Sequence, residues 1–560
     1  MDNKTISRRL KLLGQLMELH DENPFKVRSV MNASFKIDKL PFQAAGKPLA
    51  ELEKIDGIGK STAAKVWELL DTQTLAELEG FIAKTPSGVI EIMSVKGLGP
   101  KKASVIWKTL GIEDLGELLY ACNENRLIEA KGFGSKTQEE IIKAIEFKLA
   151  GSGKFLYAHL VLLAEQLLAD IKTCTGDAPV IITGEFRRRC EIINSLDFLV
   201  CDKPASSFEP ITDRLTVIGR TGDKITAEAN NGLKVNIHFC AAAEMGWELI
   251  HHTGNESHVS SLKDLLAGKD LLTYTEPEIY EMAGLSYIEP ELREGFNELE
   301  LARENKLPEL LTYNDLKGTL HNHSTWSDGV NTLEEMALYC RDVLNLEYLG
   351  NCDHSKSAVY AKGLSEERVI AQHAEIDLLN HKLAPFKIFK GIESDILSDG
   401  SLDYPDEILA TFDFVVASIH SAFKMTEERA AERLVKAIEN PYTTILGHPT
   451  GRLLLSRSGY PVDFRKIIDA CAANGVVIEI NANPLRLDMD WRWHRYATDK
   501  GVLLSVNPDA HRTEGFHDMH YGVLVARKGG LAAANCLNTF SMEEISRFFD
   551  QRKVRSSNNT

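Results

Sequence analysis

Residues 320–329 read LHNHSTWSDG. His321 and His323 stand two apart, so on a β-strand their side chains would face the same way. Asp328 follows in a run of small polar residues that is typical of a loop. Imidazoles and carboxylates are the groups that bind divalent metal ions. We therefore expect a metal site to begin in this segment.

Further histidines and carboxylates close apolar, strand-like segments downstream. The segments are EYLG, FKIFKG, FDFVVASIH, TTILGHP and VLLSVNPDAH. Their alternation with helical segments predicts a parallel α/β architecture, in which groups at successive strand ends meet at one mouth of a barrel. The predicted ligands are His321, His323, Asp328, His354, Glu393, His420, His448, Asp509 and His511.

A single histidine at a strand end is more often a buried, hydrogen-bonded side chain than a metal ligand. Six histidines with three carboxylates at successive strand ends reverse that preference. Nine ligands exceed what one ion needs, so we predict two or three divalent ions of zinc, manganese or iron. Such a cluster activates water and neutralises phosphate oxygens, which predicts a metal-dependent phosphoesterase.

Three glycine hairpins recur near the N-terminus: DGIGK at 56–60, KGLGPK at 96–101 and KGFGSK at 131–136. Their glycines allow a sharp turn between helices, which leaves backbone amides and a helix N-terminus facing outward toward a phosphate. One hairpin alone is equally explained as a C-capping glycine before a new helix. Three copies resemble helix-hairpin-helix motifs, which bind the DNA backbone without reading bases. The predicted DNA-binding residues are Gly57, Gly59, Lys60, Gly97, Gly99, Lys101, Gly132, Gly134 and Lys136.

The order of motifs over about residues 1–310 resembles a bacterial family X DNA polymerase. The likeness rests on ENPF at 22–25, the hairpins, GEFRR at 184–188, TGNE at 253–256 and PELREG at 290–295. It implies a nucleotidyltransferase-like palm with a thumb-like region. It also implies a centre of three carboxylates around two magnesium ions.

This polymerase-like centre departs from the family pattern. Ser195 replaces the first Asp of an Asp-x-Asp pair, Asp197 remains, and Asn236 replaces the third Asp. Glu185 replaces the serine that approaches the nucleotide phosphates. Because a hydroxyl and an amide lack the charge that holds two hard cations, we predict an inactive centre without magnesium. The residues assigned to it are Glu185, Arg187, Arg188, Ser195, Asp197 and Asn236, of which the arginines could still contact phosphates.

The pattern over about residues 317–550 is similar to the PHP (polymerase and histidinol phosphatase) domain, in the version fused to bacterial family X polymerases. The resemblance implies a trinuclear site with the nine ligands named above. It also implies that Asp353 and Asp395 orient ligands. Thr319 stands where the family often has an aspartate. Arg452 is either a contact to a substrate phosphate or an ordinary surface arginine. Asn481, Asn483 and Arg486 are expected to line the mouth.

The net charge of −17 over 560 residues is unevenly spread. Residues 1–150 hold 22 Lys and Arg against 21 Asp and Glu, which allows a local basic patch that binds DNA.

The nine cysteines form no CxxC pair, which predicts neither a disulfide scaffold nor a thiolate zinc site. No segment approaches the roughly 20 apolar residues of a membrane span, and the N-terminus lacks the pattern of a signal peptide. We predict a cytoplasmic monomer that does not associate with membranes.

The predicted fold class is multidomain α+β and α/β. It combines a helical helix-hairpin-helix region, a nucleotidyltransferase-like palm and thumb, and a distorted, TIM-like PHP barrel. The expected domains are an N-terminal DNA-binding domain at 1–90 and a fingers-like hairpin region at 91–152. A palm at 153–245, a thumb-like region with linker at 246–312 and a PHP domain at 313–560 follow.

These features predict a DNA-repair nuclease that binds gapped, nicked or damaged duplex through its backbone. The metal cluster would hydrolyse phosphodiesters as a 3′→5′ exonuclease. Cleavage at abasic sites is a second activity that the same cluster could perform. One alternative is an active gap-filling polymerase that proofreads with its PHP domain. Others are a small-molecule phosphatase, such as one acting on histidinol phosphate, and a binding module with two inert centres.

Overall fold

The computed structural model describes residues 1–128, 130, 132–150, 153–202, 205 and 213–559. Lys131 of the third predicted hairpin lies outside these residues. The chain divides into two compact units, Met1–Lys148 and Leu149–Thr560. The finer five-domain division stays a prediction. None of the described helices is long and apolar enough to cross a membrane.

The first unit is helical. Its helices are α1 (Asn3–Leu19), α2 (Pro24–Asp38), α3 (Leu49–Leu52), α4 (Lys60–Thr72), α5 (Ala76–Lys84), α6 (Ser87–Ile92), α7 (Pro100–Lys108), α8 (Leu115–Asn123) and α9 (Ser135–Ala150). Helix α1 buries Ile6, Leu10, Leu13 and Met17, whose spacing of three and four residues forms one apolar stripe. Asp2 caps the start of this helix, and its side chain accepts a hydrogen bond from the Thr5 amide.

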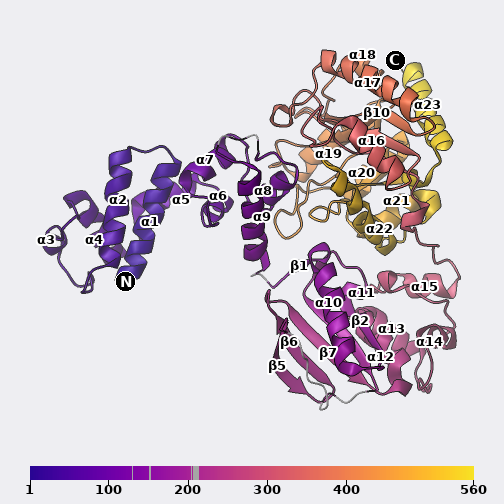
Figure 1. Ribbon diagram of the computed structural model, residues 1–560, viewed down its shortest axis with the longest axis horizontal. Coiled ribbons are helices and arrows are strands. Elements are labelled where there is room, and N and C mark those ends of the chain that lie inside the picture. Colours follow the sequence, from indigo (N-terminus) through magenta and orange to yellow (C-terminus); the bar gives the residue numbers. More distant parts are fainter. Residues whose placement is uncertain (129, 131, 151–152, 203–204, 206–212, 560) are drawn as a thin grey trace. The chain divides into compact units, whose positions relative to one another are not determined.

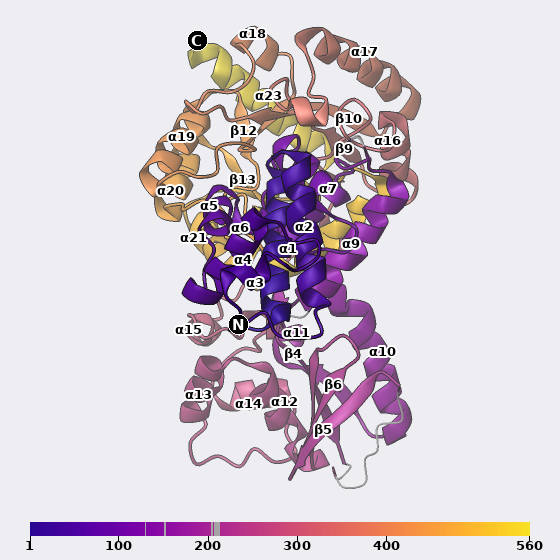
Figure 2. The ribbon, with the colours of Figure 1, turned by 90° about the vertical axis from the view of Figure 1, so that its left-hand side faces the viewer.

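The second unit begins with a palm-like α/β layer. Its strands are β1 (Phe155–Leu156), β2 (Val180–Thr183), β3 (Ile192–Ile193), β4 (Ser195–Cys201), β5 (Leu215–Thr221), β6 (Lys224–Ala229) and β7 (Lys234–Cys240). The main sheet has the order β2-β4-β7-β6-β5, with β4 and β7 parallel. The helices are α10 (Tyr157–Thr175), α11 (Gly184–Arg187), α12 (Met245–Thr253), α13 (Glu256–Leu265), α14 (Glu276–Met282) and α15 (Glu298–Arg303). Figure 2 shows the strands between α10 and the group α12, α13 and α14.

The C-terminal part is a seven-stranded parallel sheet with the order β14-β13-β12-β11-β10-β9-β8. Its strands are β8 (Gly318–Thr319), β9 (Tyr348–Asn351), β10 (Lys387–Asp395), β11 (Phe414–Ser418), β12 (Thr443–Leu446), β13 (Val477–Asn481) and β14 (Leu504–Asn507). A parallel bridge between Asn322 and Ala510 joins the chain beyond the two edge strands. The sheet is therefore nearly closed, and the predicted TIM-like barrel is confirmed.

Helices surround this barrel (Figure 1). They are α16 (Leu333–Asp342), α17 (Glu366–Leu383), α18 (Asp406–Leu409), α19 (Glu427–Glu439), α20 (Phe464–Asn474), α21 (His494–Asp499), α22 (Met519–Lys528) and α23 (Met542–Asn559). Strands β9, β11, β12 and β14 are buried along their whole length, as is usual for a parallel sheet covered on both faces. Helix α16 begins with a capping box between Thr332 and Glu335.

The interior of the barrel is filled near the start of its strands. Phe389 and Phe414 point inward there, and Phe549 of α23 stacks on Phe414 with ring centroids 4.9 Å apart. Because this end is packed with apolar side chains, polar groups gather at the opposite end. The carboxyl ends of the strands lie there, as in other barrels of this type.

Candidate metal centre

All nine predicted ligands lie at or just beyond the carboxyl ends of the barrel strands. His321, His323 and Asp328 follow β8, His354 follows β9, Glu393 lies near the end of β10, His420 follows β11, His448 follows β12, and Asp509 and His511 follow β14. Each of their side chains is buried or nearly so, and the least buried, His420, is 11% exposed. The barrel topology thus brings together residues that lie far apart in the sequence.

Glu393 lies at the middle of this group. Its Oε1 is 3.0 Å from Nε2 of His448, 3.2 Å from Nε2 of His420 and 3.3 Å from Nε2 of His321. Its Oε2 is 2.9 Å from Nδ1 of His354 and 3.6 Å from Nε2 of His323. One carboxylate thus faces five imidazoles, an arrangement of donors suited to holding metal ions.

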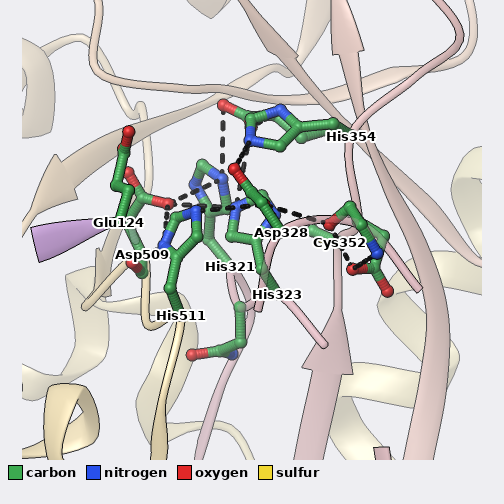
Figure 3. Close-up of polar contacts among 12 residues, drawn as sticks. Glu124, His321, His323, Asp328, Cys352, His354, Asp509 and His511 are labelled. Carbon is green, nitrogen blue, oxygen red and sulfur yellow. Dashed lines mark hydrogen bonds and ion pairs between the residues drawn. The ribbon is translucent and has the colours of Figure 1, made fainter. Parts of the chain in front are cut away.

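Two further carboxylates, Asp328 and Asp509, lie among the histidines of this group (Figure 3). Asp328 lies 3.4 Å from Nε2 of His511 and 3.6 Å from Nε2 of His354. Asp509 lies 3.0 Å from Nε2 of His323. Three overlapping sets each bring their ligand atoms within 4.8 Å of one another: His323, Asp328, His354 and His511; His321, His323 and Glu393; and His354, Glu393 and His420.

The residues present fit metal ions. His321 Nε2, Asp328 Oδ2 and Glu393 Oε2 are buried, yet none has a hydrogen-bond partner within the part of the chain that the structure describes. Buried polar atoms without such partners are costly unless another group satisfies them. Imidazole nitrogens and carboxylate oxygens aimed at one another match the donor set of divalent zinc, manganese or iron. The cluster therefore has the set of donor atoms that a metal site requires.

Charge in the cluster is complementary. Burial alone would raise the pKa of Glu393, but His420, His321 and His354 hold it well below its ordinary range. Burial alone would lower the pKa of His420, but Glu393 and Asp395 raise it to about 10. The carboxylates thus strongly favour positive charge beside them, which is the property that a cation site requires.

Glu479 is a functional candidate that the sequence analysis missed. It lies on β13 with no exposed surface, accepts a hydrogen bond from the His448 amide at 2.7 Å, and its Oε1 lies 2.8 Å from Nδ1 of His321. The signal was present, because Glu479 is a charged residue inside the apolar run VVIEI. A carboxylate behind a histidine fixes which ring nitrogen faces the metal.

The residues predicted to orient ligands contact them or their loops. Asp395 lies 2.6 Å from Nδ1 of His420. Asp353 accepts hydrogen bonds from the amides of Ser324 and Ser327, in the loop that carries Asp328. Asn481, which was predicted to line the mouth, donates to Oδ2 of Asp509 at 3.1 Å.

Arg452 is tied to the protein itself. Its guanidinium donates to Asp490 at 2.8 Å and to the Arg486 carbonyl at 2.9 Å, and it also donates to the Leu487 carbonyl. Its side chain is 12% exposed. These contacts favour the structural interpretation of Arg452, and the phosphate contact stays a prediction.

In the polymerase-like centre, Asp197 lies between two neutral hydrogen-bond donors. Asp197 and Asn236 are neighbours on β4 and β7, and Asn236 Nδ2 donates to Asp197 Oδ1 at 2.8 Å. Ser195 Oγ donates to the other oxygen at 2.7 Å. Both oxygens of Asp197 are thus engaged by side chains that stand where the polymerase pattern has carboxylates. Glu185 accepts from the backbone and side-chain nitrogens of Asn194.

The two arginines of this centre form ion pairs. Arg187 binds Glu276 through both terminal nitrogens, and Arg188 pairs with Glu294 at 2.8 Å. Arg188 also donates to the Thr253 carbonyl at 2.7 Å. In this structure the arginines join the palm to the thumb-like helices, and a contact to phosphate stays a prediction.

The glycine hairpins have the backbone that their sequences predict. Gly57, Gly97 and Gly132 have φ angles of +82°, +90° and +93°, which other residues rarely adopt. The apolar residues between the glycines, Ile58, Leu98 and Phe133, are buried. Gly59 and Gly99 are the N-caps of α4 and α7, without a side-chain cap. The lysines after the turns are exposed: Lys60, Lys101 and Lys136. Each hairpin thus presents amides and a cation to solvent.

Comparison with known proteins agrees with these features. Residues 1–75 match the family model of a helix-hairpin-helix domain, and residues 89–146 match a SAM-like helix-hairpin-helix tandem. The chain is 32% identical to the DNA polymerase/3′-5′ exonuclease PolX of Bacillus subtilis, over 98% of this chain and 99% of that protein. A probable phosphatase of Acetivibrio thermocellus is 30% identical over 42% of this chain and 95% of its own length. A probable phosphatase of Caldanaerobacter subterraneus is 36% identical over 32% of this chain and 72% of its own length.

Proposed function

Because the chain belongs to the PolX family of DNA polymerase/3′-5′ exonucleases, we propose that it is a DNA-repair nuclease whose polymerase-like centre is inactive. The nine side chains of the barrel mouth would hold two or three divalent ions and hydrolyse DNA phosphodiesters from the 3′ end. The observation that carries this proposal is the convergence of five histidines on Glu393.

Each part of the barrel mouth has a distinct role in the proposed reaction. Bound ions supply Lewis-acid chemistry, which activates water and neutralises phosphate oxygens. Glu393 and Asp509 hold the histidines in one group, while Glu479 and Asp395 fix the ring orientation of His321 and His420. The apolar packing beneath Phe414 excludes water from the other end of the barrel.

The hairpins would bring DNA to this nuclease. Their exposed lysines and glycine amides suit the phosphates of gapped or nicked duplex. Binding through phosphates also suits a repair enzyme, which must act at any sequence. Cleavage at abasic sites belongs to this proposal as an additional activity of the same metal site.

The engaged oxygens of Asp197 support an inactive polymerase centre. Ser195 and Asn236 donate to both of them, and neither supplies the negative charge that a second magnesium ion needs. A working gap-filling polymerase with a proofreading PHP domain is therefore the less favoured alternative. A small-molecule phosphatase accounts for the barrel, and it leaves the hairpins without a role.

A labelled gapped duplex with manganese separates these functions in one assay. The proposed nuclease shortens the 3′ end and does so without added deoxynucleotides. Extension that depends on deoxynucleotides would instead identify a polymerase, and neither reaction would identify a binding module. His321→Ala should abolish the shortening, whereas His381→Ala, on the exposed face of α17, should leave it unchanged.

A further inference from the structure

A second group of metal-binding side chains lies in the palm, outside the candidate metal centre. Glu248, His251 and His252 lie on α12 at a spacing that places them on one face of the helix. Each offers one ligand atom, and these three atoms lie within 4.8 Å of one another. Oε2 of Glu248 is 3.3 Å from Nε2 of His252. Small rotations of the side chains would bring all three onto one ion.

A third imidazole stands behind this group. His238 on β7 packs against His252 with ring centroids 3.9 Å apart, and its Nε2 lies 3.6 Å from Oδ1 of Asp197. His238 stands two residues after Asn236, so both side chains face the same side of the sheet. The histidine group therefore adjoins the polymerase-like centre, where two carboxylates of the family pattern are replaced.

The donors suit a different class of ion from magnesium. Magnesium prefers oxygen ligands in an octahedral arrangement, whereas imidazoles with one carboxylate suit zinc and its neighbours among the transition metals.

Access to the group is open. The side chains of Glu248 and His252 are 28% and 21% exposed, and His251 is exposed. An ion can enter from solvent and keep a water in its fourth position, while the packing of His238 holds the ring of His252 in place. We propose that the palm binds one divalent transition-metal ion of the zinc class through Glu248, His251 and His252, at the edge of the polymerase-like centre.

Counting bound zinc tests this proposal on the full chain. The protein is stripped with a chelator, dialysed against zinc and measured by elemental analysis. We expect the variant E248Q/H251N/H252N to hold one ion fewer per chain than the unmodified protein. The control His381→Asn, another exposed helical histidine, should hold the unmodified number. Equal counts in the triple variant and the unmodified protein would overturn the proposal.

His251→Asn gives a second reading that a folding defect does not mimic, because His251 is exposed. Its zinc-free melting temperature should match that of the unmodified protein, and one zinc should bind at least about tenfold more weakly. An unchanged affinity for every zinc ion in this variant would also contradict the proposal. The 3′-shortening activity should persist in both variants, since the barrel ligands are untouched. The palm site and the proposed nuclease can therefore fail independently.

Discussion

Oε1 of Glu479 lies 2.8 Å from Nδ1 of His321, and both side chains are fully buried in the barrel. This contact leaves Nε2 of His321 directed at Glu393 and Asp509, at 3.3 Å and 3.6 Å. The tautomer and the tilt of the ring are thus set by a residue that faces the histidine from behind.

Glu479→Gln should therefore weaken metal binding without removing a ligand. An amide in place of the carboxylate stabilises the oriented ring less, so we expect about 10- to 100-fold lower metal affinity or 3′-shortening rate. Metal titration and single-turnover assays measure both. The matched control is Glu298→Gln, since Glu298 pairs with the buried His258 away from the cluster. An effect of equal size in the control would show that general destabilisation is the cause.

The ion pairs of Glu276 predict a dependence of stability on pH. Burial alone would raise the pKa of Glu276, but hydrogen bonds and charge from Arg187 and Arg293 lower it. Its contribution to stability is therefore present above the ordinary glutamate pKa of about 4.3 and is lost as the pH falls through the lowered value. Denaturant melts between neutral and acidic pH measure this window.

Glu276→Gln should lower the free energy of unfolding by about 3 kcal/mol at neutral pH, because it leaves the fully buried Arg293 without its charged partner. The deficit should shrink in acid, where the unmodified protein loses the same charge. The exposed Glu281→Gln is the control and should change stability by no more than about 0.5 kcal/mol. A deficit that stays constant down to the acid transition would contradict the linkage.

Lys101→Ala should weaken binding to duplex DNA of any sequence. The exposed lysine follows the Gly97–Gly99 turn, where it can neutralise one phosphate. Losing one such contact should reduce the slope of log affinity against log salt by about 0.9. Fluorescence anisotropy over a range of salt concentrations measures it. Lys466→Ala, on the outer surface of the barrel, should leave the slope unchanged.

The polymerase-like centre should incorporate no deoxynucleotides on a primed template. Since Asp197 is the single family carboxylate retained there, its replacement by alanine should change nothing in a primer-extension assay. Steady, template-dependent extension that Asp197→Ala abolishes would show that the centre is active.

The barrel could be predicted because apolar strand-like segments alternate with helical ones. The nine candidate ligands lie close together because they follow these strands or stand near their ends, and parallel strands bring their carboxyl ends together. Glu479 was not predicted because it lies within a strand. The sequence pattern of that strand does not show which of its faces points toward the candidate ligands. The pairing of Asp197 with Asn236 could not be predicted, because it depends on the register of β4 and β7. That register is set by packing across the sheet. The ion pairs of Arg187 and Arg188 join residues 89 and 106 positions apart, so local sequence does not indicate them.

The histidine group on α12 could not be predicted from the sequence either. His251 and His252 directly precede the TGNE motif. This segment was interpreted through its resemblance to the family, and the two histidines were not considered as metal ligands. The contact of His252 with His238 follows from how α12 packs on the palm sheet, which no helical or strand period encodes.

Glu393 gives the most direct test of the account, since five histidines converge on its two oxygens. Glu393→Gln keeps the shape of the side chain and removes its charge. We predict that this variant binds fewer divalent ions per chain than the unmodified protein. Its rate of 3′ shortening on a 3′-labelled gapped duplex should fall by more than about 100-fold, a larger loss than that expected for a residue that only orients a ligand. Unchanged metal content together with unchanged 3′ shortening would contradict a metal-dependent nuclease at the barrel mouth.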